Sequence, residues 1–136
     1  MSTEANPVDG GDPVGRPDPD RMRIVGLRLF QRVSHRWCLD DAQRALLLGL
    51  SDEEFARVRG DPLSSITPLM LMRISHVLAI YTALQSLLSE PQSAKWIHGR
   101  NTAPGFGGRP ALARMLSPDV AELRAVREYL EAQLNR

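Results

Sequence analysis

Cysteine, aromatic residues and lysine are all scarce in this sequence of 136 residues. The single cysteine, Cys38, excludes an internal disulfide and any metal site built from several cysteines, and it suits a reducing cytoplasm. Aromatic residues make up 5% of the chain and hydrophobic residues 43%, so the chain has room for one compact core or two very small ones that share an interface. Lys95 is the one lysine among 17 cationic residues, so arginine supplies nearly all the positive charge.

Signals for export and for membrane insertion are also missing. The N-terminus has no basic start followed by an apolar run, which argues against a secretory signal. The most apolar stretch, residues 69–88, is interrupted by arginine, histidine, glutamine and serines, which are costly inside a bilayer. We therefore expect a cytoplasmic protein without membrane contact, in which residues 69–88 form a buried helix.

The first 20 residues differ sharply from the rest of the chain. They hold five acidic residues and one arginine, with many Pro and Gly residues and almost no large apolar side chains. Such a segment cannot bury enough surface to offset its ordering entropy, so residues 1–20 are predicted to be a disordered acidic tail. Because the whole chain carries +1, the remaining residues carry about +5, which permits nucleic-acid binding without implying it.

No segment alternates between apolar and polar residues over the length of a strand, so we expect an all-α fold, a compact helical bundle. A first helix is predicted from about residue 21, with Asp20 as its N-cap, and the Glu90 and Pro91 pair is expected to end the long helix that Thr67 and Pro68 begin. The other helices are predicted at residues 41–48, 52–60, 93–98 and 110–116, with a last helix that Ser117 and Pro118 begin.

The first predicted helix has an apolar side and an arginine side. Leu27, Phe30, Val33 and Trp37 recur at helical spacing, and the opposite side carries Arg21, Arg28, Arg32 and Arg36. There is no acidic residue among residues 21–36. This arginine side is either an ordinary solvated helix face or a surface for phosphates or an acidic partner.

Residues 41–60 fit the pattern of a helix-turn-helix. Ala45 stands at the crowded contact between the two helices, Gly49 at the turn, and four apolar residues occupy the later core positions: Leu48, Leu50, Phe55 and Val58. Asp40 or Asp41 is expected to cap the first helix, and Ser51 with Glu54 to form a capping box on the second. Arg44 departs from the pattern, since an apolar residue is expected there.

DNA binding through this unit is a separate question, because the second helix begins with three acidic residues, Asp52 to Glu54. Carboxylates at that end favour the helix dipole but repel DNA phosphates. Arg57 and Arg59 could offset them, as could the arginine side of the first helix. The candidate DNA-binding residues are therefore Arg28, Arg32, Arg36, Ser51, Arg57 and Arg59.

The sequence contains no pattern typical of a catalytic or metal-binding site. The three histidines are far apart in sequence, and none has a second ligand at metal spacing. Cys38 with His35 would need a third orienting group. The Gly-rich stretch at residues 105–110 lacks the strand, the lysine and the hydroxyl residue of a phosphate-binding loop, and its glycines suit a turn instead. We expect no enzymatic activity, no cofactor and no metal.

The most specific pattern lies at residues 95–134. An amphipathic segment with Trp96 leads into Asn101, a Gly-rich turn, Pro110 with a short helix, and a final amphipathic helix. On these residues alone the segment is a helical hairpin with an aromatic plug. It also resembles the C-terminal toxin-binding domain of the MbcA/ParS/Xre antitoxins, on twelve positions: Trp96, Asn101, Phe106, Gly107, Gly108, Pro110, Leu112, Met115, Leu116, Val126, Tyr129 and Leu130.

The resemblance, which covers residues 20–136 when the Xre-like helix-turn-helix is included, implies a function. Family members neutralise a RES-domain toxin that acts on NAD, and they repress their own operon through the N-terminal unit. The implied toxin-binding residues are Trp96, Asn101, Phe106, Gly107, Gly108, Pro110, Tyr129, Leu130, Leu134 and Arg136, of which Tyr129, Leu130 and Leu134 are expected anchors. Arg136 and the terminal carboxylate are hypothesised to block groups that NAD would meet.

These patterns divide the chain into the tail at residues 1–20, the helix-turn-helix region at 21–66, and the long helix with the toxin-binding domain at 67–136. Because residues 69–88 are apolar on nearly every side, we expect a homodimer within a larger toxin–antitoxin complex. Two other functions stay open: a DNA-binding regulator without a toxin partner, and a small helical homodimer that acts only as a scaffold.

Overall fold

The computed structural model describes residues 18–136, which form eight α-helices and no β-strand. The helices are α1 (Pro19–Arg36), α2 (Asp41–Leu48), α3 (Asp52–Gly60), α4 (Pro62–Ser65), α5 (Pro68–Leu87), α6 (Glu90–His98), α7 (Ala111–Met115) and α8 (Val120–Leu134). The predicted all-α fold is confirmed for this part of the chain. None of these helices combines the length and the apolar character needed to cross a membrane. Most of the predicted disordered tail lies outside the described residues.

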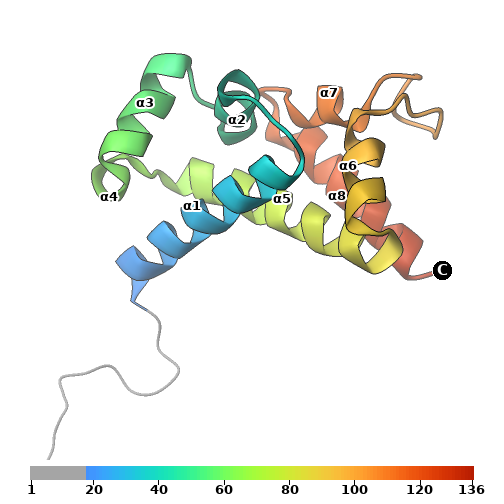
Figure 1. Cartoon of the computed structure of the whole chain (residues 1–136), viewed down its shortest axis with the longest axis horizontal. Coiled ribbons are helices and arrows are strands. Elements are labelled where there is room, and N and C mark those ends of the chain that lie inside the picture. Colours follow the sequence, from blue (N-terminus) through green and yellow to red (C-terminus); the bar gives the residue numbers. More distant parts are fainter. Residues whose placement is uncertain (1–17) are drawn as a thin grey trace, which may run out of the picture.

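Helix α5 lies at the centre of the molecule (Figure 1). It packs most extensively against α8 and α1, and it also contacts α2 and α6. Met70, Ile74, Val77, Ile80 and Leu84 of α5 are all buried, as its apolar sequence predicts. A single hydrophobic core therefore extends from α1 and the α2–α3 pair to α7 and α8.

The N-terminal helices begin at polar caps. Helix α1 begins two residues earlier than predicted: Asp18, not Asp20, is its N-cap, and the Asp18 carboxylate accepts a hydrogen bond from the Asp20 N–H at 3.1 Å. Pro19 explains the difference, because proline lacks an N–H and suits the first helical position. The caps predicted for the next two helices are confirmed, with capping boxes at Asp40 and Ser51.

Two predicted boundaries in the C-terminal half are wrong. Helix α5 ends at Leu87, and Glu90 and Pro91 begin α6 instead of ending α5. Ser89 caps α6, and proline is as suitable in the first turn of a helix as just beyond its end. Helix α8 begins at Val120 with Asp119 as its N-cap, so the predicted start at Ser117 and Pro118 is replaced by a turn.

The α2–α3 unit has the core that the helix-turn-helix pattern predicts. Ala45, Leu48, Phe55 and Val58 are buried, and Gly49 joins the helices with a left-handed φ of 76°. Arg44, the departure from the pattern, is only partly buried. Its guanidinium donates to Ser34 Oγ and to the Asp41 carboxylate, both at 3.0 Å, so a polar anchor to α1 replaces the expected apolar contact.

Candidate functional site

Three aromatic side chains from three segments of the C-terminal half form one cluster. The rings of Trp96 in α6 and Tyr129 in α8 are stacked, with centroids 6.5 Å apart and an interplanar angle of 16°. Phe106, from the loop between α6 and α7, meets both rings edge-on at 6.0 and 5.2 Å. Each such pair contributes about 0.5–1.5 kcal/mol beyond the area that it buries. Phe106 is buried and the other two rings are partly exposed, so this aromatic cluster fastens three segments together and reaches the surface.

The loop that carries Phe106 is closed by hydrogen bonds at its base. The Asn101 carbonyl accepts from the Gly108 N–H at 3.0 Å, and the Asn101 N–H donates to the Arg109 carbonyl at 3.2 Å. The Asn101 side chain accepts from the Ala103 N–H at 3.0 Å, which starts the turn. Asn101 therefore holds the loop through both its backbone and its side chain, a role that its position in the predicted motif did not specify.

Glycine is required in this loop by backbone conformation. Gly105, Gly107 and Gly108 have φ angles of 94°, 63° and 76°, which other residues rarely adopt. A Cβ at Gly107 or Gly108 would meet no atom within 4 Å, so no side chain covers these two residues. Pro110 follows as the N-cap of α7. The Gly-Gly-x-Pro segment thus presents open backbone beside the aromatic cluster.

The predicted anchors at the end of α8 have different surroundings. Leu130 is 2% exposed and belongs to the core, whereas Leu134 is 43% exposed. Arg136 is exposed as well. Leu134 and Arg136 are therefore free to touch a partner in this structure, and Leu130 can act only by holding the helix in place.

Arg114 is a residue of this region that sequence reasoning missed. Its guanidinium lies 5.7 Å from the centroid of the Phe106 ring, and its Nε donates to Glu122 at 2.7 Å. A Cβ at Gly105 would lie 3.0 Å from Arg114 Nη1. A hollow of about 330 Å³ lies here, lined in part by Gly105, Arg109 and Arg114. The sequence shows Arg114 only as one charge on a short helix.

Arg73 was also missed, although it is 1% exposed. Its guanidinium donates to the carbonyls of Leu47 at 2.5 Å, Ser117 at 3.0 Å and Met115 at 3.2 Å. Burial lowers the pKa of Arg73, but an arginine stays charged. It therefore neutralises the negative ends of α2 and α7 at once. Its signal in the sequence is a lone charge inside the most apolar helix.

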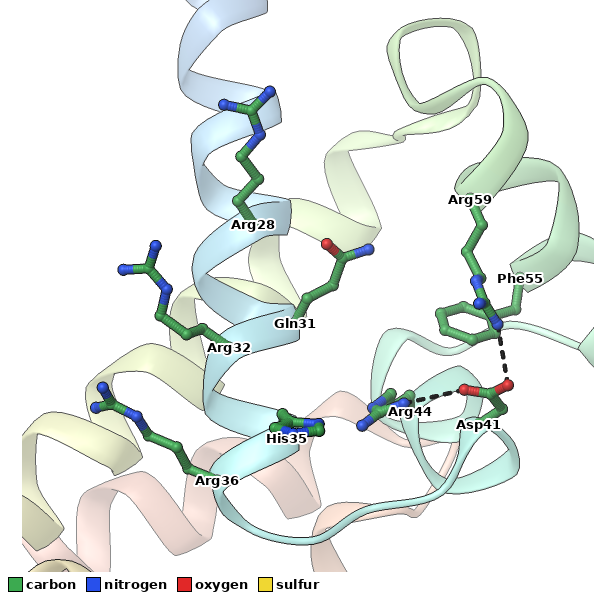
Figure 2. A pocket seen from close by; sticks show the side chains of 9 residues that line it. All are labelled: Arg28, Gln31, Arg32, His35, Arg36, Asp41, Arg44, Phe55 and Arg59. Atoms are coloured by element: carbon green, nitrogen blue, oxygen red, sulfur yellow. Dashed lines mark hydrogen bonds and ion pairs between the residues drawn. The ribbon is translucent and has the colours of Figure 1, made fainter.

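A second surface lies between α1, α2 and α3 and is called here the basic groove (Figure 2). It is an open hollow of about 630 Å³, lined by Arg28, Gln31, Arg32, His35, Arg36, Asp41, Arg44, Phe55 and Arg59. Figure 2 shows Gln31 and His35 on the side of α1 that faces α2 and α3, while Arg32 and Arg36 project from the outer side of α1. Five arginines thus share the groove with a single carboxylate.

That carboxylate, Asp41, is held by two arginines. Arg59 Nη1 lies 2.9 Å from one Asp41 oxygen, and Arg44 Nη1 lies 3.0 Å from the other. The hydrogen bond from Arg59, followed by that from Arg44, lowers the pKa of Asp41. Arg59 also lies over the Phe55 ring, 5.5 Å from its centroid. Asp41 therefore positions Arg59 toward α1 and leaves one of the two arginine charges uncompensated.

The predicted DNA-binding residues do not form one surface. Arg28, Arg32, Arg36 and Arg59 line the basic groove, but Arg57 lies in a different hollow beside Glu54. The Ser51 hydroxyl accepts from the Glu54 N–H at 3.1 Å, so it serves as a cap. No group of three potential metal ligands occurs within residues 18–136.

The fold and these surfaces define a helical protein with an N-terminal helix-turn-helix unit and a C-terminal aromatic hairpin. Residues 83–134 match the family described as the antitoxin Xre/MbcA/ParS C-terminal toxin-binding domain. The chain is also 33% identical over 122 residues to the uncharacterized protein y4oB of Sinorhizobium fredii (strain NBRC 101917 / NGR234), with 86% of this chain and 91% of that protein covered. The chain belongs to the Xre/MbcA/ParS antitoxin family, and its role is that of an antitoxin with a toxin partner.

Proposed function

We propose that this antitoxin binds and inhibits a RES-domain toxin that acts on NAD, through the surface formed by the aromatic cluster, the Gly-rich loop and the end of α8. The observation that carries the proposal is the exposed backbone of Gly107 and Gly108 beside the partly exposed rings of Trp96 and Tyr129. Rigid aromatic side chains and open backbone are suited to a protein interface, because they lose little entropy on binding. The partner's chemistry comes from the family resemblance.

The exposed end of α8 offers a direct test. Leu134→Glu should weaken neutralisation when the chain is co-expressed with the toxin encoded in the adjoining reading frame, because a charge would enter the interface. Leu63→Glu is the matched control, since Leu63 is 46% exposed in α4 and Leu134 43% exposed in α8. Cell growth and the NAD level report neutralisation. Equal neutralisation by both variants would place the toxin elsewhere.

Deletion of residues 133–136 tests the finer proposal that Arg136 and the terminal carboxylate obstruct NAD. The deletion should relieve inhibition of the toxin's NAD turnover. Full inhibition by the shortened chain would show that these residues are dispensable.

We further propose that the N-terminal half represses the operon that encodes the antitoxin. Two observations favour this second function: the α2–α3 core matches a helix-turn-helix, and five arginines line the basic groove beside it. Gel-shift titration with the DNA upstream of the gene is the test. A regulator without a toxin partner would bind this DNA but would not protect cells from the toxin.

A homodimer is proposed through α5. Leu69 is 57% exposed and Met72 48% exposed, and the two side chains lie one turn apart in the first half of α5. A second copy packed across a two-fold axis would cover both side chains. Light scattering at micromolar concentration should therefore report a dimer that Met72→Glu weakens, and a monomeric wild-type chain would contradict the proposal.

A further inference from the structure

The charge of the basic groove is not balanced by the described residues. Arg28 and Arg32 make no ion pair or side-chain hydrogen bond within residues 18–136. Arg44 and Arg59 share Asp41, and Arg36 lies 3.6 Å from Glu90. The groove therefore keeps a positive potential that attracts an anionic partner.

The arginines of α1 are spaced for a partner with several charges in a row. Arg28, Arg32 and Arg36 lie on successive turns, and a rise of 1.5 Å per residue separates neighbouring positions by about 6 Å along the helix axis. Three guanidinium groups thus extend over about 12 Å. A single carboxylate would engage only one of them, whereas successive phosphates could engage Arg28 and Arg32 directly, and Arg36 once it leaves Glu90 and the Tyr81 hydroxyl.

The lining of the groove favours nucleic acid over protein. Protein interfaces are centred on buried apolar or aromatic anchors, whereas nucleic-acid interfaces are polar and positive. Phe55 is the one aromatic residue in the lining, and it is 5% exposed and lies beneath Arg59. The other lining residues are arginines, Gln31, His35 and Asp41, which offer hydrogen bonds and charge but no apolar anchor.

Helix α3, which a helix-turn-helix would normally direct toward DNA, has the opposite character. Asp52, Glu53 and Glu54 are exposed in its first turn. Its two arginines are separated, because Arg59 is paired with Asp41 in the basic groove and Arg57 lies beside Glu54. The start of α3 would therefore repel phosphates, while α1 beside it would attract them.

We propose that the basic groove binds the phosphate backbone of DNA and that α1, not the start of α3, makes the main contacts. The inference rests on the proposed repression of the operon and names the surface that carries it out. In an ordinary helix-turn-helix the second helix, here α3, enters the major groove, whereas here the main contacts would come from α1, which precedes the α2–α3 unit.

The test compares two double variants that remove the same charge from different places. The groove variant, Arg28→Gln with Arg32→Gln, removes the two arginines of the basic groove that make no ion pair. The control variant, Arg57→Gln with Arg124→Gln, removes two exposed arginines from α3 and α8. Full-length protein is titrated by fluorescence anisotropy against the duplex upstream of the gene and an unrelated duplex, over a range of salt concentrations. Circular dichroism melting checks that both variants fold.

The groove variant should lose at least tenfold in affinity for both duplexes, and the slope of log K against log salt should become shallower by about 2, one unit for each lost phosphate contact. The control variant should lose less than threefold. Arg28→Lys with Arg32→Lys should keep most of the affinity, because the charge is retained.

The alternative results are distinguishable. If the groove variant binds like the wild type while the control loses affinity, the proposed groove is wrong and operon repression stands. If the wild-type chain binds neither duplex, both proposals fail. If DNA binding is unchanged in the groove variant and neutralisation of the toxin is lost, the groove is a protein-binding surface and the inference is overturned.

Discussion

The two halves of this antitoxin present surfaces of different kinds. Around α1 to α3 the surface is defined by charge, with arginines arranged over an ordinary helical scaffold. Around α6 to α8 it is defined by shape, with stacked rings and a loop that needs left-handed glycines. Charge can be rearranged on a helix without altering the fold, whereas shape depends on each residue that builds it. This difference explains why the individual residues of the C-terminal half, and not the arginines of the N-terminal half, indicate the family.

Arg73 joins the two halves of the molecule, so its substitution should destabilise both of them together. Arg73→Met would leave the carbonyls of Leu47, Met115 and Ser117 without their donor inside the core. We expect the free energy of unfolding to fall by about 3 kcal/mol or more in chemical denaturation. Arg73→Lys should recover part of the loss. A fall below about 1 kcal/mol for the Met variant would mean that the two helix ends do not depend on Arg73.

Trp96→Ala tests the dependence of the C-terminal half on shape. The substitution removes the stack on Tyr129 and the edge contact with Phe106, so the free energy of unfolding should fall by about 2 kcal/mol. Arg32→Ala in the basic groove should change it by less than about 0.5 kcal/mol, since this side chain is exposed and makes no ion pair or side-chain hydrogen bond within residues 18–136. Thermal melting of both variants measures the difference in stability, and equal losses of stability would contradict the expected dependence on shape.

Glycine substitutions sharpen the comparison further. Gly49→Ala should cost about 1–2 kcal/mol, because φ is 76° and the new Cβ would lie 3.2 Å from Arg73 Cδ. Gly107→Ala has a similar φ of 63° but open space, so only the backbone strain of about 1 kcal/mol applies. Gly60→Ala is the control, with neither feature. Denaturation midpoints should follow this order, and a larger effect at Gly107 than at Gly49 would contradict it.

The smallest expected effect is a pH dependence at the α5–α8 contact. Burial, followed by the nearby charge of Arg127, lowers the pKa of His76, whose Nδ1 lies 3.3 Å from Arg127 Nη1. The folded state thus binds this proton less readily than the unfolded chain does. Stability from this group is present above the ordinary histidine pKa near 6.5 and is lost as the pH falls below it. His76→Gln should flatten stability against pH in that window, and an unchanged profile would remove His76 as the cause.

Helix existence and capping were largely predictable from the sequence. Asp40, Gly49, Ser51 and Thr67 occupy the predicted caps and turns, because their side chains or backbone angles suit few other positions. Pro91 misled the prediction because proline suits both the start of one helix and the space after another. Boundaries that rest on such a residue are decided by packing.

The residues of the aromatic cluster were predictable from the sequence, but their contacts were not. Trp96, Phe106 and Tyr129 were identified from the motif, yet nothing in their spacing gives the stacking between α6 and α8. The pairing of Arg59 with Asp41 joins residues 18 apart in sequence and separates Arg59 from Arg57. Long-range contacts of this kind depend on how the helices cross, which local patterns do not encode.

The most direct test of the account is the toxin's own reaction. The proposed RES-domain toxin is purified and assayed for NAD consumption while the antitoxin is added in increasing amounts. We expect NAD consumption to fall to the background at a fixed ratio of antitoxin to toxin, and Leu134→Glu to need a clear excess to reach the same point. Unchanged NAD consumption in the presence of excess wild-type antitoxin would contradict the proposed function.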